Sequence, residues 1–157
     1  MNGDHDTNAE MDGDMPATDP KNTELKQKLL RMASLAEGAV NQAVRSLLRR
    51  DDGLAEQVLQ GDDTIDQFEV EMDEAVLQML AAEPLPVSDL RELTTVMKVA
   101  HDLERVGDEA TTIARRSIKL GLEPELPQVQ AVPKLARLAI DLLKESLDTF
   151  VNRESNQ

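Results

Sequence analysis

The chain has 157 residues, which suffices for one helical domain with a modest core and is short for two full-sized domains. It contains no cysteine, so disulfides, thiolate metal sites and a cysteine nucleophile are excluded, and carboxylates or histidine must hold any metal. A formal net charge of -14, without any Trp or Tyr, argues against nucleic acid as a partner.

The first residues predict neither a membrane anchor nor a leader. No apolar stretch approaches the roughly 18 residues that a membrane span needs, and the N-terminus is acidic where a signal peptide carries positive charge. We therefore expect a soluble, cytoplasmic protein. Residues 1–21 combine Asp, Asn, Gly and Pro with almost nothing apolar, and this composition predicts a disordered acidic tail.

Two amphipathic helices follow the tail. Residues 22–50 and 54–81 carry apolar side chains at spacings of three and four, which is the helical period. Asn22 and Thr23 are suited to cap the first helix. The proline-rich break at 84–86 ends the second helix.

Two further helices complete the chain. The third, capped by Ser88 or Asp89, runs to Gly121, and the fourth covers about residues 128–154. Strand signals are lacking and the connections are short, which favours antiparallel neighbours. The sequence therefore predicts an all-α, up-and-down antiparallel helical bundle.

A weak internal repeat relates the fourth helix to the first. Leu35 and Ala36 match Leu138 and Ala139 when the two helices are aligned, and an arginine recurs near both ends. The last helix therefore resembles the first helix starting again.

Acidic residues form rows on the second and third helices. Glu104 and Asp108 lie side by side on one face of the third helix, with His101 one turn earlier. Four acids follow one another on the second helix, and these are Asp62, Asp66, Glu69 and Asp73. If the two helices are antiparallel neighbours, the rows converge on an oxygen-rich site suited to Fe, Mn, Mg or Ca, with Zn also possible. The simpler alternative is a charged face that is only solvated.

Catalytic groupings are missing from the sequence. There is no phosphate loop, no HExxH pair and no nucleophile elbow, and His5 and His101 are the only histidines. We therefore expect a protein that is not an enzyme.

Residues 62–114 resemble the PhoU (phosphate-uptake regulator) family. The resemblance rests on a DxxID sequence with further spaced acids, a proline-rich break, DLR at the start of the next helix, and DLERVGD. It implies a three-helix repeat at 22–121, and a helix at 128–154 that begins an incomplete second repeat. It further implies that ExxxD motifs bind iron or zinc. Glu104 and Asp108 match this motif, and the acids of the second helix belong to the accompanying pattern.

The resemblance also implies a function. Family members are negative regulators of the phosphate-starvation response and of phosphate uptake, acting as adaptors between a phosphate ABC transporter and a sensor histidine kinase, and reaching the membrane only through such partners. Two alternatives remain open: a helical interaction module whose acids are only solvated, and an accessory subunit of a phosphate or cation permease. A fourth helix exposing Leu138, Leu142 and Phe150 would be an apolar liability, which favours a homodimer over a helix that only joins its own bundle.

Overall fold

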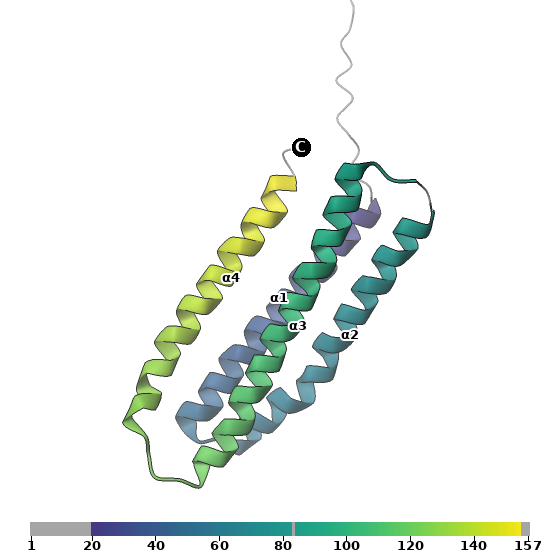
Figure 1. The fold of residues 1–157 in the computed structure, drawn as a ribbon. Helices are drawn as coiled ribbons and strands as arrows, with labels where there is room; N and C mark the ends of the chain where they lie inside the picture. The colour runs from purple at the N-terminus through teal and green to yellow at the C-terminus, as the bar shows by residue number, and fades with distance from the viewer. Residues whose placement is uncertain (1–19, 83, 155–157) are drawn as a thin grey trace, which may run out of the picture.

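The structure, a computed structural model, describes residues 20–82 and 84–154. Its elements are α1 (Pro20–Arg49), α2 (Asp52–Ala82), α3 (Val87–Gly121), the short 3-10 helix η1 (Pro127–Ala131) and α4 (Val132–Glu154). The long helices run alternately up and down (Figure 1), and the described residues contain no strand. The all-α bundle is thus confirmed. None of the helices described is long and apolar enough to cross a membrane.

The start of α1 differs from the prediction by two residues. The helix begins at Pro20, so Asn22 and Thr23 lie inside its first turn and not at the position before it. Proline is well suited to the first position of a helix, because its ring fixes the helical φ and its missing N–H would have had no partner there. Of the predicted tail, residues 1–19 lie outside the described part of the chain.

The start of α3 also corrects a prediction. The helix follows Pro86, whose φ of -55° and ψ of 153° turn the chain into the helix without any side-chain cap. Ser88 donates its hydroxyl hydrogen to Asp89 Oδ1 over 2.8 Å, so neither residue serves the backbone as predicted. The rigid proline takes the place of the polar cap that we expected.

Arg50 connects the α1–α2 corner to the far end of α3. It adopts a left-handed φ of 53° directly after α1, and its guanidinium donates to the carbonyl oxygens of Leu120 (2.9 Å), Gly121 (2.8 Å) and Glu123. Leu120 and Gly121 end α3 and Glu123 follows it, so Arg50 adds donors at a helix end, where carbonyl oxygens have few partners within the helix. Next to Arg50, Asp51 Oδ1 accepts the Leu54 N–H over 3.0 Å and caps α2.

The first three helices form one packed unit, and α4 lies beside it. The core joins α1, α2 and α3 through fully buried side chains, the largest apolar ones being Leu29, Met32, Met72, Leu103, Val76 and Val96. Among the long helices described, α4 contacts α1 alone, and it also contacts η1. It buries Ile140 and Leu147, and its Lys144 Nζ lies 2.7 Å from Glu37 Oε1 of α1. The fourth helix is therefore an addition to a three-helix unit.

Candidate metal centre

A glycine sets how closely α2 approaches α3. Gly107 is buried, and a Cβ placed there would lie 3.0 Å from Cδ1 of Ile65 on α2 and 3.7 Å from Oδ1 of Asp62. The missing side chain therefore lets α2 pack directly on the α3 backbone. Because the two helices are packed neighbours of opposite direction (Figure 1), acids from both meet along this contact.

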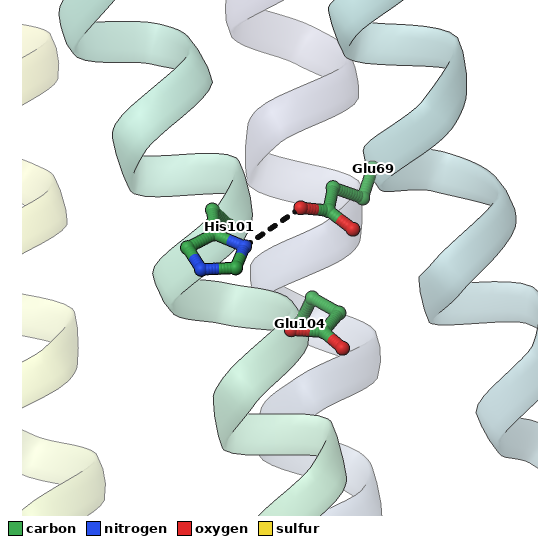
Figure 2. A group of neighbouring side chains, drawn as sticks. All are labelled: Glu69, His101 and Glu104. Carbon is green, nitrogen blue, oxygen red and sulfur yellow. Dashed lines mark hydrogen bonds and ion pairs between the residues drawn. The ribbon is translucent and has the colours of Figure 1, made fainter.

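Three side chains meet at the centre of the α2–α3 contact. His101 Nδ1 lies 2.8 Å from Glu69 Oε1, and one ligand atom each from Glu69, His101 and Glu104 lie within 4.8 Å of one another. Figure 2 shows Glu69 reaching from α2 toward the two α3 side chains. His101 and Glu104 are three residues apart, so they share one face of their helix. The two glutamates are half-buried and the histidine is exposed.

Further carboxylates surround this group and raise one another's pKa. Burial, followed by the charges of Asp108, Glu69 and Asp66, raises the pKa of Glu104. Burial and then Asp108 raise the pKa of Asp66, and burial followed by Asp66 and Asp108 raises that of Asp62. Each of these groups is thus easier to protonate than an isolated carboxyl, which marks a site of strongly negative potential.

His101 supplies the nearest counter-charge. Its pKa is raised chiefly by its hydrogen bond to Glu69, so the imidazolium form is favoured beside the carboxylates. A metal ion would need the neutral imidazole instead, because only an unprotonated nitrogen can act as a ligand. Proton and metal therefore compete for this side chain.

Asp62 presents an unsatisfied oxygen in the same contact. Its Oδ1 is buried and has no hydrogen-bond partner in the described structure. A buried carboxylate oxygen without a partner is costly unless a proton or a cation neutralises it. This oxygen is an independent sign that the α2–α3 contact is built to receive positive charge.

The donor set fits a metal ion. Two ligand atoms at right angles, each about 2.1 Å from an ion, are about 3 Å apart, and the Glu69–His101 pair is separated by 2.8 Å. The ligand atoms of the three residues lie within 4.8 Å of one another, and two ligands on opposite sides of one ion are about 4.2 Å apart. Small side-chain rotations would therefore bring all three atoms within reach of one ion. Mixed carboxylate and imidazole donors suit zinc, iron and manganese.

The structure brings together most, but not all, of the residues that the sequence singled out. Those from Asp62 to Glu69 on α2 interact electrostatically with Glu104 and Asp108, as expected for antiparallel neighbours. Asp73 lies one turn beyond Glu69, and no contact in the described part of the chain brings it into the group. The role of any of these residues as a ligand stays a prediction. The direct Glu69–His101 contact and the part played by Gly107 were not foreseen.

Comparison with known proteins identifies the family of this chain. The PhoU domain family model matches residues 29–117, which is more than half of the chain. The phosphate-specific transport system accessory protein PhoU homolog of Pseudomonas putida is 39% identical over 134 residues, 85% of this chain and 52% of that protein. The homolog of Aquifex aeolicus is 33% identical over 132 residues, 84% of this chain and 60% of that protein.

A solved structure agrees with these sequence relatives. The crystal structure of PhoU from Pseudomonas aeruginosa superposes with a TM-score of 0.80 at 38% sequence identity, covering 84% of this chain and 64% of that chain. This chain thus spans little more than half the length of the two relatives above. With a matching family model over most of α1 to α3, the chain belongs to the PhoU family.

Proposed function

We propose that the protein is a cytoplasmic, metal-binding regulatory adaptor of phosphate homeostasis that restrains phosphate uptake and the phosphate-starvation response, and that it is not an enzyme. Its relatives are named as accessory proteins of a phosphate-specific transport system, which supports this proposal. The observation that carries it is the group formed by Glu69, His101 and Glu104 between α2 and α3.

The residues of this group would hold a divalent ion such as zinc or iron. The ion would neutralise carboxylates that otherwise repel one another, with Asp62, Asp66 and Asp108 contributing further negative charge. Since the ligands come from two helices, binding would link α2 to α3. The metal would thereby fix the surface of the three-helix unit that partners contact.

The partners in this proposal are a phosphate ABC transporter and a sensor histidine kinase. When phosphate is plentiful, the protein would hold the kinase in the state that does not activate its response regulator. It would work as a homodimer and reach the membrane only through these partners. An alternative is that the protein is an accessory subunit of a permease. Recovery of that permease in a pull-down from membranes, in place of the ABC transporter, would favour this alternative.

Metal content tests the site. We would measure metal per chain by elemental analysis after reconstitution with zinc, iron or manganese, in the wild type and in a Glu69→Gln/Glu104→Gln variant. The control is Glu56→Gln/Glu74→Gln, which removes the same charge from two exposed positions on α2. We expect about one ion or more per chain in the wild type and the control, and loss in the site variant. Equal, near-zero content in all three proteins would refute metal binding.

A cellular experiment tests the regulation. Cells lacking the protein should express phosphate-starvation genes even when phosphate is plentiful, and the wild-type chain should restore repression. The site variant should fail to restore it while the control succeeds. Full repression by the site variant would instead favour the second candidate, an interaction module whose acids are only solvated. The exposed leucines of α4 are consistent with such a module.

A further inference from the structure

A pocket of about 400 Å³ lies where the end of α1 and the end of α3 meet the segment that leads to α4. Its apolar walls come from Leu47 and Leu48 of α1, Leu120 of α3, and Leu126 and Val129 of the connecting segment. The pocket lies at the end of the bundle away from the point where α4 ends (Figure 1). Apolar walls with a few polar groups, in a pocket of this size, are typical of small-molecule sites.

One polar side chain of this pocket lacks a hydrogen-bond partner. Ser117 of α3 lines the pocket and is only 2% exposed, and its Oγ has no partner in the described structure. Other buried hydroxyls donate to their own helix: Ser46 Oγ lies 2.8 Å from the carbonyl oxygen of Ala43, and Thr111 Oγ1 lies 2.9 Å from that of Asp108. A buried hydroxyl without a partner is costly, so Ser117 is suited to bind a ligand in the pocket.

Arg50 supplies a permanent positive charge to the same pocket. It lines the pocket, and its three contacts with backbone carbonyls at the end of α3 all use Nη2. The N–H groups of its Nε and Nη1 have no partner among the described residues. Because a guanidinium is always charged and matches the oxygens of a carboxylate or a phosphate, Arg50 has donors left for an anion.

The charge around the pocket also favours an anion. Residues 45–50 and 115–121, at the ends of α1 and α3, contain six basic residues and no acid, although the chain as a whole has a net charge of -14. The negative ends of the two helices balance only about one of these charges, since each end amounts to roughly half a charge. Glu125 also lines the pocket, but it is exposed, so water and salt screen its charge.

We propose that this pocket binds a small organic anion with an aliphatic body. The carboxylate or phosphate head of the ligand accepts hydrogen bonds from Arg50 and from the Ser117 hydroxyl, and its body packs on the leucines and Val129 of the walls. Ser117 lies more than three helical turns along α3 from Glu104, so the pocket is separate from the proposed metal site. The proposal therefore stands or falls independently of metal binding.

Nuclear magnetic resonance of the isotope-labelled full chain tests the pocket, in a chelator so that metal plays no part. Octanoate and octyl phosphate combine an anionic head with an aliphatic body, and both should shift backbone amide signals saturably at millimolar concentrations. The largest shifts should fall on residues 117–130, and the tighter of the two probes identifies the head group. Octanol lacks the charge, acetate lacks the body and octylammonium has the opposite charge, so each of these should bind more weakly.

A pair of serine variants tests the role of the buried hydroxyl. Ser117→Ala should weaken octanoate binding by about two- to tenfold, which is the effect of one lost hydrogen bond. The matched control is Ser46→Ala, which removes the hydroxyl of an equally buried serine outside the pocket and should bind octanoate as the wild type does. Because Ser117 Oγ has no partner, Ser117→Ala should also raise the melting temperature of the ligand-free protein, which shows that the variant is folded.

Filling the pocket gives a further test that does not depend on Ser117. Val129→Trp places a large side chain in the pocket and should abolish the octanoate shifts, whereas Leu122→Trp, on the same segment but 88% exposed and outside the pocket, should not. Absence of saturable binding of both anionic probes to the wild type, or octanol binding as tightly as octanoate, would overturn the anion site. Equal octanoate binding by Ser117→Ala and the wild type, or shifts confined to the exposed leucines of α4, would overturn it as well.

Discussion

Removing one charge from the α2–α3 site should stabilise the metal-free protein. Glu104 is half-buried and lies among Asp108, Glu69 and Asp66, all of which raise its pKa, as burial does most strongly. Its carboxylate is therefore held in a place that disfavours negative charge. Glu104→Gln keeps the shape of the side chain and removes the charge, so the repulsion disappears with little change in packing.

The size of the stabilisation follows from the number of like-charged neighbours of Glu104. One like-charged neighbour at helical spacing destabilises by about 0.2–0.5 kcal/mol, and Glu104 has one such neighbour on α3 and two across the contact on α2. The lost attraction to His101 offsets part of the gain, so the net stabilisation should be about 0.5–1 kcal/mol. For a chain of this size the melting temperature should rise by about 2–3 °C.

The assay is thermal and urea denaturation in the presence of a chelator, followed by circular dichroism. The control is Glu74→Gln, which removes one exposed charge from α2 and should change stability by less than half as much. The gain in the site variant should shrink as salt is added, because ions screen exposed and half-exposed charges. If Glu104 binds metal as proposed, the order should reverse with saturating zinc, since the variant lacks this carboxylate. Equal or lower stability of Glu104→Gln without metal would refute the repulsion argument.

Three other changes have definite expected results. The raised pKa of His101 means that the folded state binds this proton more tightly than the unfolded state, so the metal-free protein should gain stability as the pH falls from about 8 to about 6. The site carboxyls, whose pKa values are raised from much lower ordinary values, should add to this gain only at lower pH, and the melting temperature in a chelator should show both effects. Gly107→Leu should destabilise by about 1–3 kcal/mol in urea titrations, because the new side chain overlaps Ile65. Arg50→Asn tolerates the left-handed backbone but loses the carbonyl contacts, and it should cost about 1–2 kcal/mol in the same titrations. Arg49→Asn, at the neighbouring exposed position, should be nearly neutral.

Helical periodicity was sufficient to predict the helices, because this periodicity depends only on residues a few positions apart in the sequence. The expected helices at 54–81 and 128–154 differ from α2 and α4 by a few residues at most. The caps were not predictable in this way. Helix α1 begins at Pro20, two residues before Asn22, and α3 follows Pro86 without a side-chain cap. Arg50 and Leu120 are 70 positions apart in the sequence, so no local pattern predicts the contact of Arg50 with the end of α3.

The candidate site was predictable in composition but not in geometry. Sequence spacing placed Glu104 and Asp108 on one face of α3, and the family pattern pointed to α2. Which turn of α2 faces which turn of α3 depends on the packing at Gly107, where the missing side chain fixes the approach of the helices. That packing selects Glu69 as the partner of His101 and leaves Asp73 outside the group.

The proposed metal site and the proposed homodimer should be coupled through the charge of the chain. The site gathers Glu69, Glu104 and further carboxylates between α2 and α3. Metal binding lowers the negative charge of each copy, which starts from -14 for the metal-free chain, and so reduces the repulsion between two copies. Zinc should therefore tighten the dimer, by about fivefold for a coupling near 1 kcal/mol, and by reciprocity the dimer should bind zinc more tightly than the monomer does.

Analytical ultracentrifugation with and without zinc, at fixed ionic strength, measures this coupling directly. The Glu69→Gln/Glu104→Gln variant provides the control, because its dimer should not respond to zinc. An identical dissociation constant for the wild type with and without zinc would show that the charge of the metal site has no effect on dimerisation.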